Sequence, residues 1–244
     1  MRRQGAVRGT GDQMEATVPT IDEALAAFLA EREGVRPPKA FGTYVEIIDL
    51  LKHSLNGYAY TSLNPFERRR WEQAFEAGDE EAFTKLFGPE KIPEHLGEFL
   101  GSFMIHKVIG PLALTAAAGP VTKDLVHWLG EQGWIDADAV TSAAERAAAA
   151  TRDLPRAERL GRLLGEQALR TDIDPTALAE ADYVEDFLTI EQVEPTALWF
   201  AGGIGPVPVS ATAAKLAQPG WSANIVLGRK AGRWHVLEVG HVYP

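Results

Sequence analysis

Ionisable residues at helical spacing are the first candidates for chemistry in this chain. Asp124 and His127 stand three residues apart, as do His95 and Glu98, so each pair would lie on one face of a helix and offer two ligands to a metal ion. Zinc sites in proteins use three or four protein ligands. Because a lone pair supplies only two, we interpret both pairs as surface hydrogen bonds or ion pairs, and we predict no metal site.

Two further patterns are typical of active sites. Asp49, His53 and Ser54 are the residue types of a catalytic triad, but neighbouring positions on one helix cannot bring Ser54 against His53 for proton transfer. The glycine-rich stretch 202–205 is typical of a phosphate-binding loop, yet such a loop leads into a helix, and here two prolines follow within three residues. We therefore predict a turn at this stretch, no enzymatic activity and no cofactor.

Arginine clusters are the candidates for contact with nucleic acid. They comprise the run Arg68, Arg69 and Arg70 and the looser group Arg152, Arg156, Arg159 and Arg162. Three consecutive residues spread over most of a helical turn, so the run cannot face one groove as a unit. The looser group is interspersed with Glu158 and Glu166. We interpret both clusters as solvated, salt-bridged faces, with phosphate binding as the alternative.

Aromatic residues near the C-terminus allow two readings. Trp199, Trp221, Trp234 and Tyr243 are enough for a platform on which bases or peptides stack. In a domain this small, aromatic residues more often form the core. Trp221 and Trp234 fall within alternating apolar and polar stretches, so we expect both in the core.

The elements that must position these residues divide the chain in two. Up to about residue 170, apolar residues recur at helical spacing between glycine and proline stops, and Thr20 with Glu23 has the spacing of a capping box. The predicted helices include 43–60, 93–108, 121–132, one from Asp138 and a separate one from Pro155. Beyond Pro175, alternation replaces helical spacing and predicts four or five short strands in a small barrel or strongly bent sheet.

The predicted fold class is therefore α+β, an all-helical N-terminal domain followed by a small β-barrel-like domain. Residues 1–19 are expected to form a disordered arm. The helical domain is predicted at 20–174, comprising 20–136 and additional helices at 137–174, and the β-rich domain at 175–244. These boundaries follow from the change in composition after Pro175.

Composition restricts the environment and the partners. The formal net charge is −10 and cysteine is absent, so disulfides and thiolate metal sites are excluded. No stretch approaches the roughly 20 apolar residues of a membrane span, and no apolar run follows the N-terminal arginines as in a secretory signal. We predict a cytoplasmic protein without a membrane partner. The acidic charge disfavours phosphate backbones as partners.

One stretch of the helical part carries a family resemblance. The sequence from Gly119 to Ile135, with Leu125, Trp128 and Leu129 on one face and a glycine turn after it, resembles the last helix of the core-binding domain of tyrosine recombinases (phage integrases). Residues 92–108 resemble the preceding helix and 44–60 an early one, so the resemblance covers roughly residues 20–136. It implies a DNA-clamping helical fold.

The catalytic half of that family has no counterpart here. Recombinases need a tyrosine nucleophile, two arginines, a lysine and a His-x-x-Arg motif, and none of the six histidines is followed by arginine at the third position. We therefore predict a non-catalytic adaptor or regulatory protein that acts through contacts with another protein. The alternative is a DNA- or RNA-associated accessory factor that uses the recombinase-like helical domain. The oligomeric state stays open.

Overall fold

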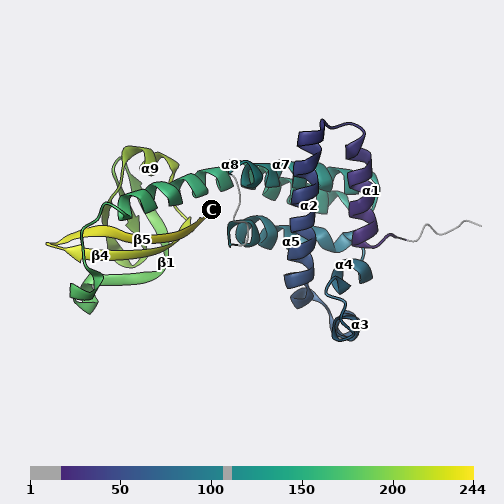
Figure 1. The fold of residues 1–244 in the computed structure, drawn as a ribbon, viewed down its shortest axis with the longest axis horizontal. Helices are drawn as coiled ribbons and strands as arrows, with labels where there is room; N and C mark the ends of the chain where they lie inside the picture. Colours follow the sequence, from purple (N-terminus) through teal and green to yellow (C-terminus); the bar gives the residue numbers. More distant parts are fainter. Residues whose placement is uncertain (1–17, 107–111) are drawn as a thin grey trace, which may run out of the picture.

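The fold combines a helical part with a five-stranded antiparallel sheet in one chain (Figure 1). The computed structural model describes residues 18–106 and 112–244. The predicted α+β class is confirmed. The predicted disordered arm, apart from Val18 and Pro19, and the predicted helix end at residue 108 lie outside the described residues.

Helices occupy the chain up to residue 168. They are α1 (Ile21–Glu33), α2 (Pro38–Tyr58), α3 (Pro65–Glu76), α4 (Ala82–Leu86), α5 (Ile92–Glu98), a π-helical turn (Phe99–Phe103), α6 (Met104–His106), α7 (Leu112–Glu131) and α8 (Ala137–Ala168), with 3₁₀ turns at Ala59–Ser62 and Pro89–Lys91. The predicted capping box is confirmed: the Glu23 amide donates to Thr20 Oγ1 at 3.2 Å, and the Thr20 amide donates to Glu23 Oε2 at 2.8 Å.

Two predicted helix boundaries are wrong. Helix α7 begins at Leu112 and runs through Pro120, and α8 runs through Pro155 as one helix of 32 residues instead of two helices. A proline inside a helix costs about 3 kcal/mol because it removes a hydrogen bond and crowds the preceding turn. The apolar stripe of α8 continues on both sides of Pro155, from Leu154 to Ala157, so burial of that stripe outweighs the cost.

The crossing of α7 and α8 depends on a glycine. A Cβ atom at Gly119 would lie 2.6 Å from the Ala147 carbonyl oxygen and 2.6 Å from the Thr151 amide nitrogen. Only glycine allows the backbones of the two helices to approach so closely. The two helices run along the long axis of the molecule, and α1 and α2 cross them (Figure 1). Phe28, Phe83, Leu96 and Leu125 are fully buried between these helices.

Two further 3₁₀ turns, Pro175–Ala177 and Glu180–Asp182, precede the sheet. Its strands are β1 (Tyr183–Glu194), β2 (Ala197–Phe200), β3 (Ile204–Pro208), β4 (Ser222–Lys230) and β5 (Arg233–Tyr243), with the short helix α9 (Ala211–Leu216) between β3 and β4. The strand order is β3-β2-β1-β4-β5. The long strand β1 pairs with β4 along its first part and with β2 beyond a bulge between Ile190 and Gln192.

The sheet is not a closed barrel, which corrects the barrel-like prediction. It bends until its edge strands β3 and β5 lie near each other, yet no ladder joins these two strands in the part of the chain that the structure describes. Pro206 and Pro208 give a reason. Proline has no N–H to donate, so the five residues of β3 offer few of the donors that closure would require.

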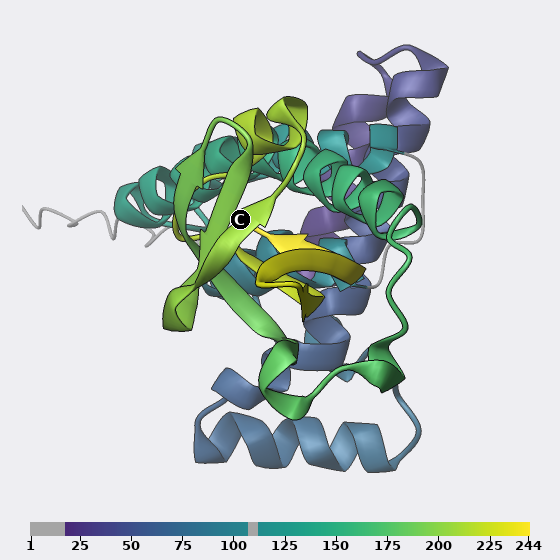
Figure 2. The same cartoon turned by 90° about the vertical axis from the view of Figure 1, so that its left-hand side faces the viewer.

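Helix α8 belongs to both halves of the molecule. Residues up to Leu154 pack in the helical core, whereas Ala157, Leu160 and Leu164 pack against the concave side of the sheet. The second half of α8 accordingly lies along the sheet (Figures 1 and 2). The predicted division at residue 174 stays a prediction, but the two cores meet inside α8, near Pro155. No helix within residues 18–106 and 112–244 has the combined length and apolarity of a bilayer span.

A fragment of residues 14–174 tests the independence of the helical part. We expect cooperative unfolding, because its core is complete, together with self-association, because Leu160 and Leu164 lose their cover. The substitutions Leu160→Glu and Leu164→Lys in the fragment should restore a monomer, measured by sedimentation and by thermal unfolding. A fragment that shows no cooperative transition with either sequence would mean that the helices depend on the sheet to fold.

Candidate functional site

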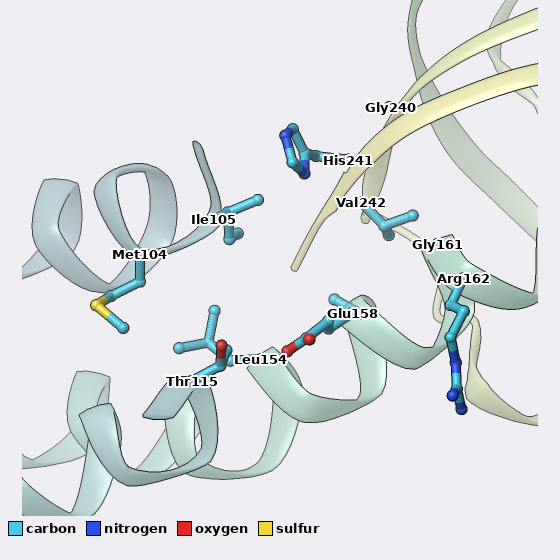
Figure 3. Close-up of a pocket in the computed structure, with 11 residues that line it drawn as sticks. Met104, Ile105, Thr115, Leu154, Glu158, Gly161, Arg162, Gly240, His241 and Val242 are labelled. Carbon is cyan, nitrogen blue, oxygen red and sulfur yellow. The ribbon is translucent and has the colours of Figure 1, made fainter. Parts of the chain in front are cut away.

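A cavity at the junction between the helical part and the sheet is the best-formed candidate site (Figure 3). Its volume is about 230 Å³. Its walls come from elements far apart in the sequence, α6, α7, α8 and the end of β5. The side chains that define it are Met104, Ile105, Thr115, Leu154, Glu158, Arg162, His241 and Val242. The cavity is therefore largely apolar with a few polar groups, the composition that small-molecule sites share.

Glu158 supplies the charge in this cavity. It follows Leu154 by one turn of α8, and Figure 3 shows its carboxylate directed toward Thr115, whereas the guanidinium of Arg162 extends the other way. The Glu158 Oε2 atom is buried and receives no hydrogen bond from any described residue. A buried acceptor without a donor is costly and rare in native proteins. This carboxylate is thus poised to accept a donor from outside the chain.

A cluster of two histidines and a tyrosine adjoins the cavity through His241, which lines it. Tyr243 Oη lies 2.7 Å from His106 Nε2, and the rings of His106 and His241 are 5.5 Å apart. Burial, together with repulsion from His106, lowers the pKa of His241 below its ordinary value. Burial raises the pKa of Tyr243. Both changes favour the uncharged forms of these side chains at neutral pH.

Asp124 is the centre of the densest polar network. Arg32 donates to both of its carboxylate oxygens, at 3.0 and 3.1 Å, Arg36 donates at 3.1 Å and the Tyr44 hydroxyl donates at 2.9 Å. Burial alone would raise the pKa of Asp124, but the hydrogen bonds from Arg32 and Tyr44 hold it below its ordinary value. The network ties α1, α2 and α7 together. Asp124 does form an ion pair, as interpreted, but its partners are arginines distant in sequence and not His127.

His95 and His53 also have hydrogen-bond partners within the protein. His95 Nε2 lies 3.2 Å from Ser62 Oγ and 3.3 Å from Glu94 Oε1. His53 Nδ1 lies 2.8 Å from the Asp49 carbonyl oxygen and the ring is exposed, whereas Ser54 is buried in the core, so the two cannot form a catalytic pair. Across the described ranges, no group of three or more histidine, aspartate or glutamate residues is arranged to hold a metal ion.

The two arginine clusters lie in different parts of the molecule. Arg68, Arg69 and Arg70 are on α3, at the far end of the helical part, whereas the second cluster is on α8, with Arg152 just before the junction and the other three on the half that lies along the sheet (Figures 1 and 2). Arg68 donates to the Tyr60 carbonyl oxygen at 3.1 Å and its guanidinium lies 5.8 Å from the centre of the Tyr60 ring. The structure therefore does not bring the two clusters onto one face.

Within the second cluster the four side chains differ in role. Arg156 donates to the Leu216 carbonyl oxygen at 3.1 Å and lies over the Trp221 ring, so it holds α9 against α8. Arg152 donates to the Ala148 carbonyl oxygen at 3.1 Å. Arg159 and Arg162 are exposed, and Arg162 edges the junction cavity. Binding of nucleic acid by either cluster stays a prediction.

The glycine-rich stretch follows its predicted role in part, and two of the four aromatic residues lie in the core as predicted. Gly202 and Gly203 lie in a turn, as predicted, whereas Ile204 and Gly205 already belong to β3. Trp221 and Trp234 are buried in the core of the sheet, also as predicted. Trp199 and Tyr243 are only half-buried: the Trp199 ring donates to Glu194 Oε1 at 2.9 Å, and Tyr243 lies beside His106. Its proximity to residue 106 could not be read from the sequence.

A second candidate site is a hollowed surface along the C-terminal half of α2, here called the α2 surface and defined by Leu50, His53, Gly57, Tyr58 and Phe75. Two depressions of about 540 and 480 Å³ lie on either side of His53 and Gly57, which line both of them. Phe75 of α3 is 47% exposed and Tyr58 is 40% exposed. Helical spacing alone does not distinguish these exposed aromatic residues from core residues, so the sequence does not reveal this surface.

Comparisons with models of known protein families, with curated proteins and with solved structures found no significant match. The resemblance of residues 20–136 to the core-binding domain of tyrosine recombinases therefore stays a prediction.

Replacement of Asp124 by asparagine should lower the free energy of unfolding by about 2–3 kcal/mol near pH 7, since hydrogen bonds to charged groups are worth roughly 1.5–3 kcal/mol. The folded-state pKa of Asp124 is below its unfolded value, so its contribution is present above about pH 4 and is lost as the pH falls through the folded pKa. The difference between wild type and Asp124→Asn should thus shrink toward about pH 3 in urea titrations.

Glu131→Gln is the matched control, because Glu131 is an exposed carboxylate on the same helix. It should change the stability by less than about 0.5 kcal/mol. A cost for Asp124→Asn as small as that of the control would show that the network does not stabilise the fold.

Proposed function

We propose that the protein is a non-catalytic adaptor or regulatory protein that binds another protein through the α2 surface. The observation that carries the proposal is the exposure of two aromatic side chains, Tyr58 and Phe75, beside open depressions on a well-formed helix. Folded proteins seldom expose contiguous apolar surface without a use for it. Aromatic residues are enriched where proteins bind one another.

The shape of the α2 surface supports a docked chain. Gly57 is exposed, and a Cβ atom there would meet no atom within 4 Å. The glycine thus leaves a shallow passage between Phe75 on one side and Tyr58 with Leu50 on the other. Side chains of a partner could fill the two depressions while its backbone crosses at Gly57.

The charge around Phe75 indicates the kind of partner. Asp49, Glu80 and Glu81 line the same depression. Lys52 is the cation beside them, but it pairs with Asp22 at 3.1 Å and approaches Glu81 at 4.0 Å. A basic segment with apolar side chains would complement this surface, and complementary charge chiefly raises the association rate and the specificity.

Gly57→Arg tests this function. The arginine side chain would obstruct the passage and repel a basic partner, whereas the fold should tolerate it because the site is open. Gly42→Arg is the control, since Gly42 is also on α2 and a Cβ there also meets no atom within 4 Å. The partner is captured with wild-type protein from the native cell extract, identified, purified and titrated against the three proteins.

We expect Gly57→Arg to weaken binding at least tenfold, and Gly42→Arg to bind like wild type. If both variants bind the purified partner as tightly as wild type, the partner uses a different surface and the α2 surface has no role in binding.

A second candidate function, binding of single-stranded DNA or RNA, is favoured by the topology of the sheet. Three consecutive strands, a helix, and a hairpin placed beside β1 give the strand order of the five-stranded Greek-key barrel called the OB-fold, here in an open form. OB-folds bind oligonucleotides with the face of strands 2 and 3 and with neighbouring loops, including the β4–β5 connection. Topology alone does not determine function, so the site must carry the argument.

The β4–β5 connection has only a few basic side chains that could contact phosphate groups. Lys230 and Arg233 are exposed there, whereas Arg229 is paired with Asp182 at 2.7 Å. Two cations neutralise about two phosphates, which predicts a shallow salt dependence with a slope of about −1.4 for single strands. Against a net charge of −10, such a site supports only weak binding.

We therefore expect fluorescence anisotropy with labelled oligothymidylate to show binding at low salt that is lost near about 150 mM salt. Lys230→Glu with Arg233→Glu should remove it, and Arg68→Ala, Arg69→Ala and Arg70→Ala together should not. Tight binding at the higher salt, or dependence on the α3 arginines, would contradict this assignment.

A further inference from the structure

We propose that the junction cavity is a binding site for a small primary amine in its ammonium form. In this assignment the ammonium group pairs with the Glu158 carboxylate in the cavity wall, and its alkyl chain lies against the apolar side chains of Met104, Ile105, Leu154 and Val242. The site differs from the α2 surface and does not depend on the adaptor function.

The unpaired carboxylate oxygen is the first argument. Glu158 Oε2 is buried among described residues and none of them donates to it. Arg162 lies one turn further along α8, where an ion pair with Glu158 is sterically accessible, yet its side chain extends away from the carboxylate (Figure 3). A donor that enters the cavity would pair with the carboxylate where that group lines the wall, in a setting where hydrogen bonds to charged groups are strong.

The surrounding groups favour a monocation over an anion or a metal ion. Glu158 is the acidic side chain of the cavity, and Arg162 and His241 are the other titratable side chains that line it; His106 and Tyr243 lie beside His241. Burial favours uncharged His241 and Tyr243. One carboxylate cannot replace the hydration of a divalent cation, which needs several oxygen ligands. An ammonium group needs only acceptors, and Thr115 Oγ1 and the His241 ring are within the same walls.

The size of the cavity limits the alkyl chain. At the ~30 Å³ that a water molecule occupies in the liquid, about 230 Å³ holds roughly seven non-hydrogen atoms. A linear amine of five carbons matches this volume. Contacts would come from α6, α7, α8 and β5 together, so the bound amine would join the helical part to the last strand of the sheet.

Full-length protein titrated with pentylammonium chloride tests the proposal, with 1-pentanol as the uncharged probe of the same chain length. Binding is measured by calorimetry and by the rise in melting temperature, which grows with ligand concentration for a ligand that binds the folded state. We expect saturable binding of the amine near or below about 1 mM. 1-Pentanol and the variant Glu158→Gln should each bind at least tenfold more weakly.

Two matched glycine variants test whether the amine binds inside the cavity, without any change of charge. A Cβ atom at Gly161 would meet Val242 Cγ2 at 3.6 Å, an ordinary contact at the cavity wall, whereas one at Gly165 would meet no atom within 4 Å. Both glycines are on α8, so both leucine variants change the helix in the same way. Gly161→Leu should abolish the response to the amine, and Gly165→Leu should retain it.

Three results would each overturn the proposal: no response to the amine at about ten times the expected dissociation constant, an equal response to 1-pentanol, or an unchanged response in Glu158→Gln. The first would mean that the cavity takes only water. Should Glu158→Gln not fold, judged by circular dichroism, the alcohol comparison and the glycine pair still decide the question.

Discussion

The continuous apolar stripe of α8 is the feature on which the rest of the structure depends. At 1.5 Å per residue its 32 residues span about 48 Å, which is longer than either core needs by itself. The first half is clamped to α7 at the Gly119 crossing, and the second half fills the concave side of the sheet. Because one helix serves both cores, Pro155 is tolerated at the position where the helix leaves one core and enters the other.

The junction cavity follows from that arrangement. Leu154 is the last α8 residue in the helical core, and Ala157 is the first in the core of the sheet. Neither core fully covers the turn of α8 between these two residues. Glu158 comes directly after this turn, and the end of β5 returns beside it, with Val242 buried and Tyr243 against His106. Glu158 therefore lies where the two cores meet, and its buried Oε2 atom accepts no hydrogen bond from a described residue of either core.

Polar side chains elsewhere are used mainly to fix helices. Asp124 gathers Arg32, Arg36 and Tyr44 and so orients α1 and α2 against α7. Arg156 holds α9 through a carbonyl oxygen and the Trp221 ring. These side chains are used to hold the fold together. The aromatic α2 surface and the junction cavity, in contrast, contain groups that no described residue covers or pairs with.

The sequence by itself determined the helical character up to residue 170, the capping box of α1, the turn at Gly202 and Gly203, and the burial of Trp221 and Trp234, because these follow from spacing and local hydrogen bonding. It misjudged Pro120 and Pro155, since a local penalty of about 3 kcal/mol is outweighed by burial that only packing reveals. The candidate sites were decided by tertiary structure alone. Glu158, His241 and Met104 are far apart in the sequence and come together only in the folded chain. The exposure of Phe75 depends on how α3 packs against its neighbours.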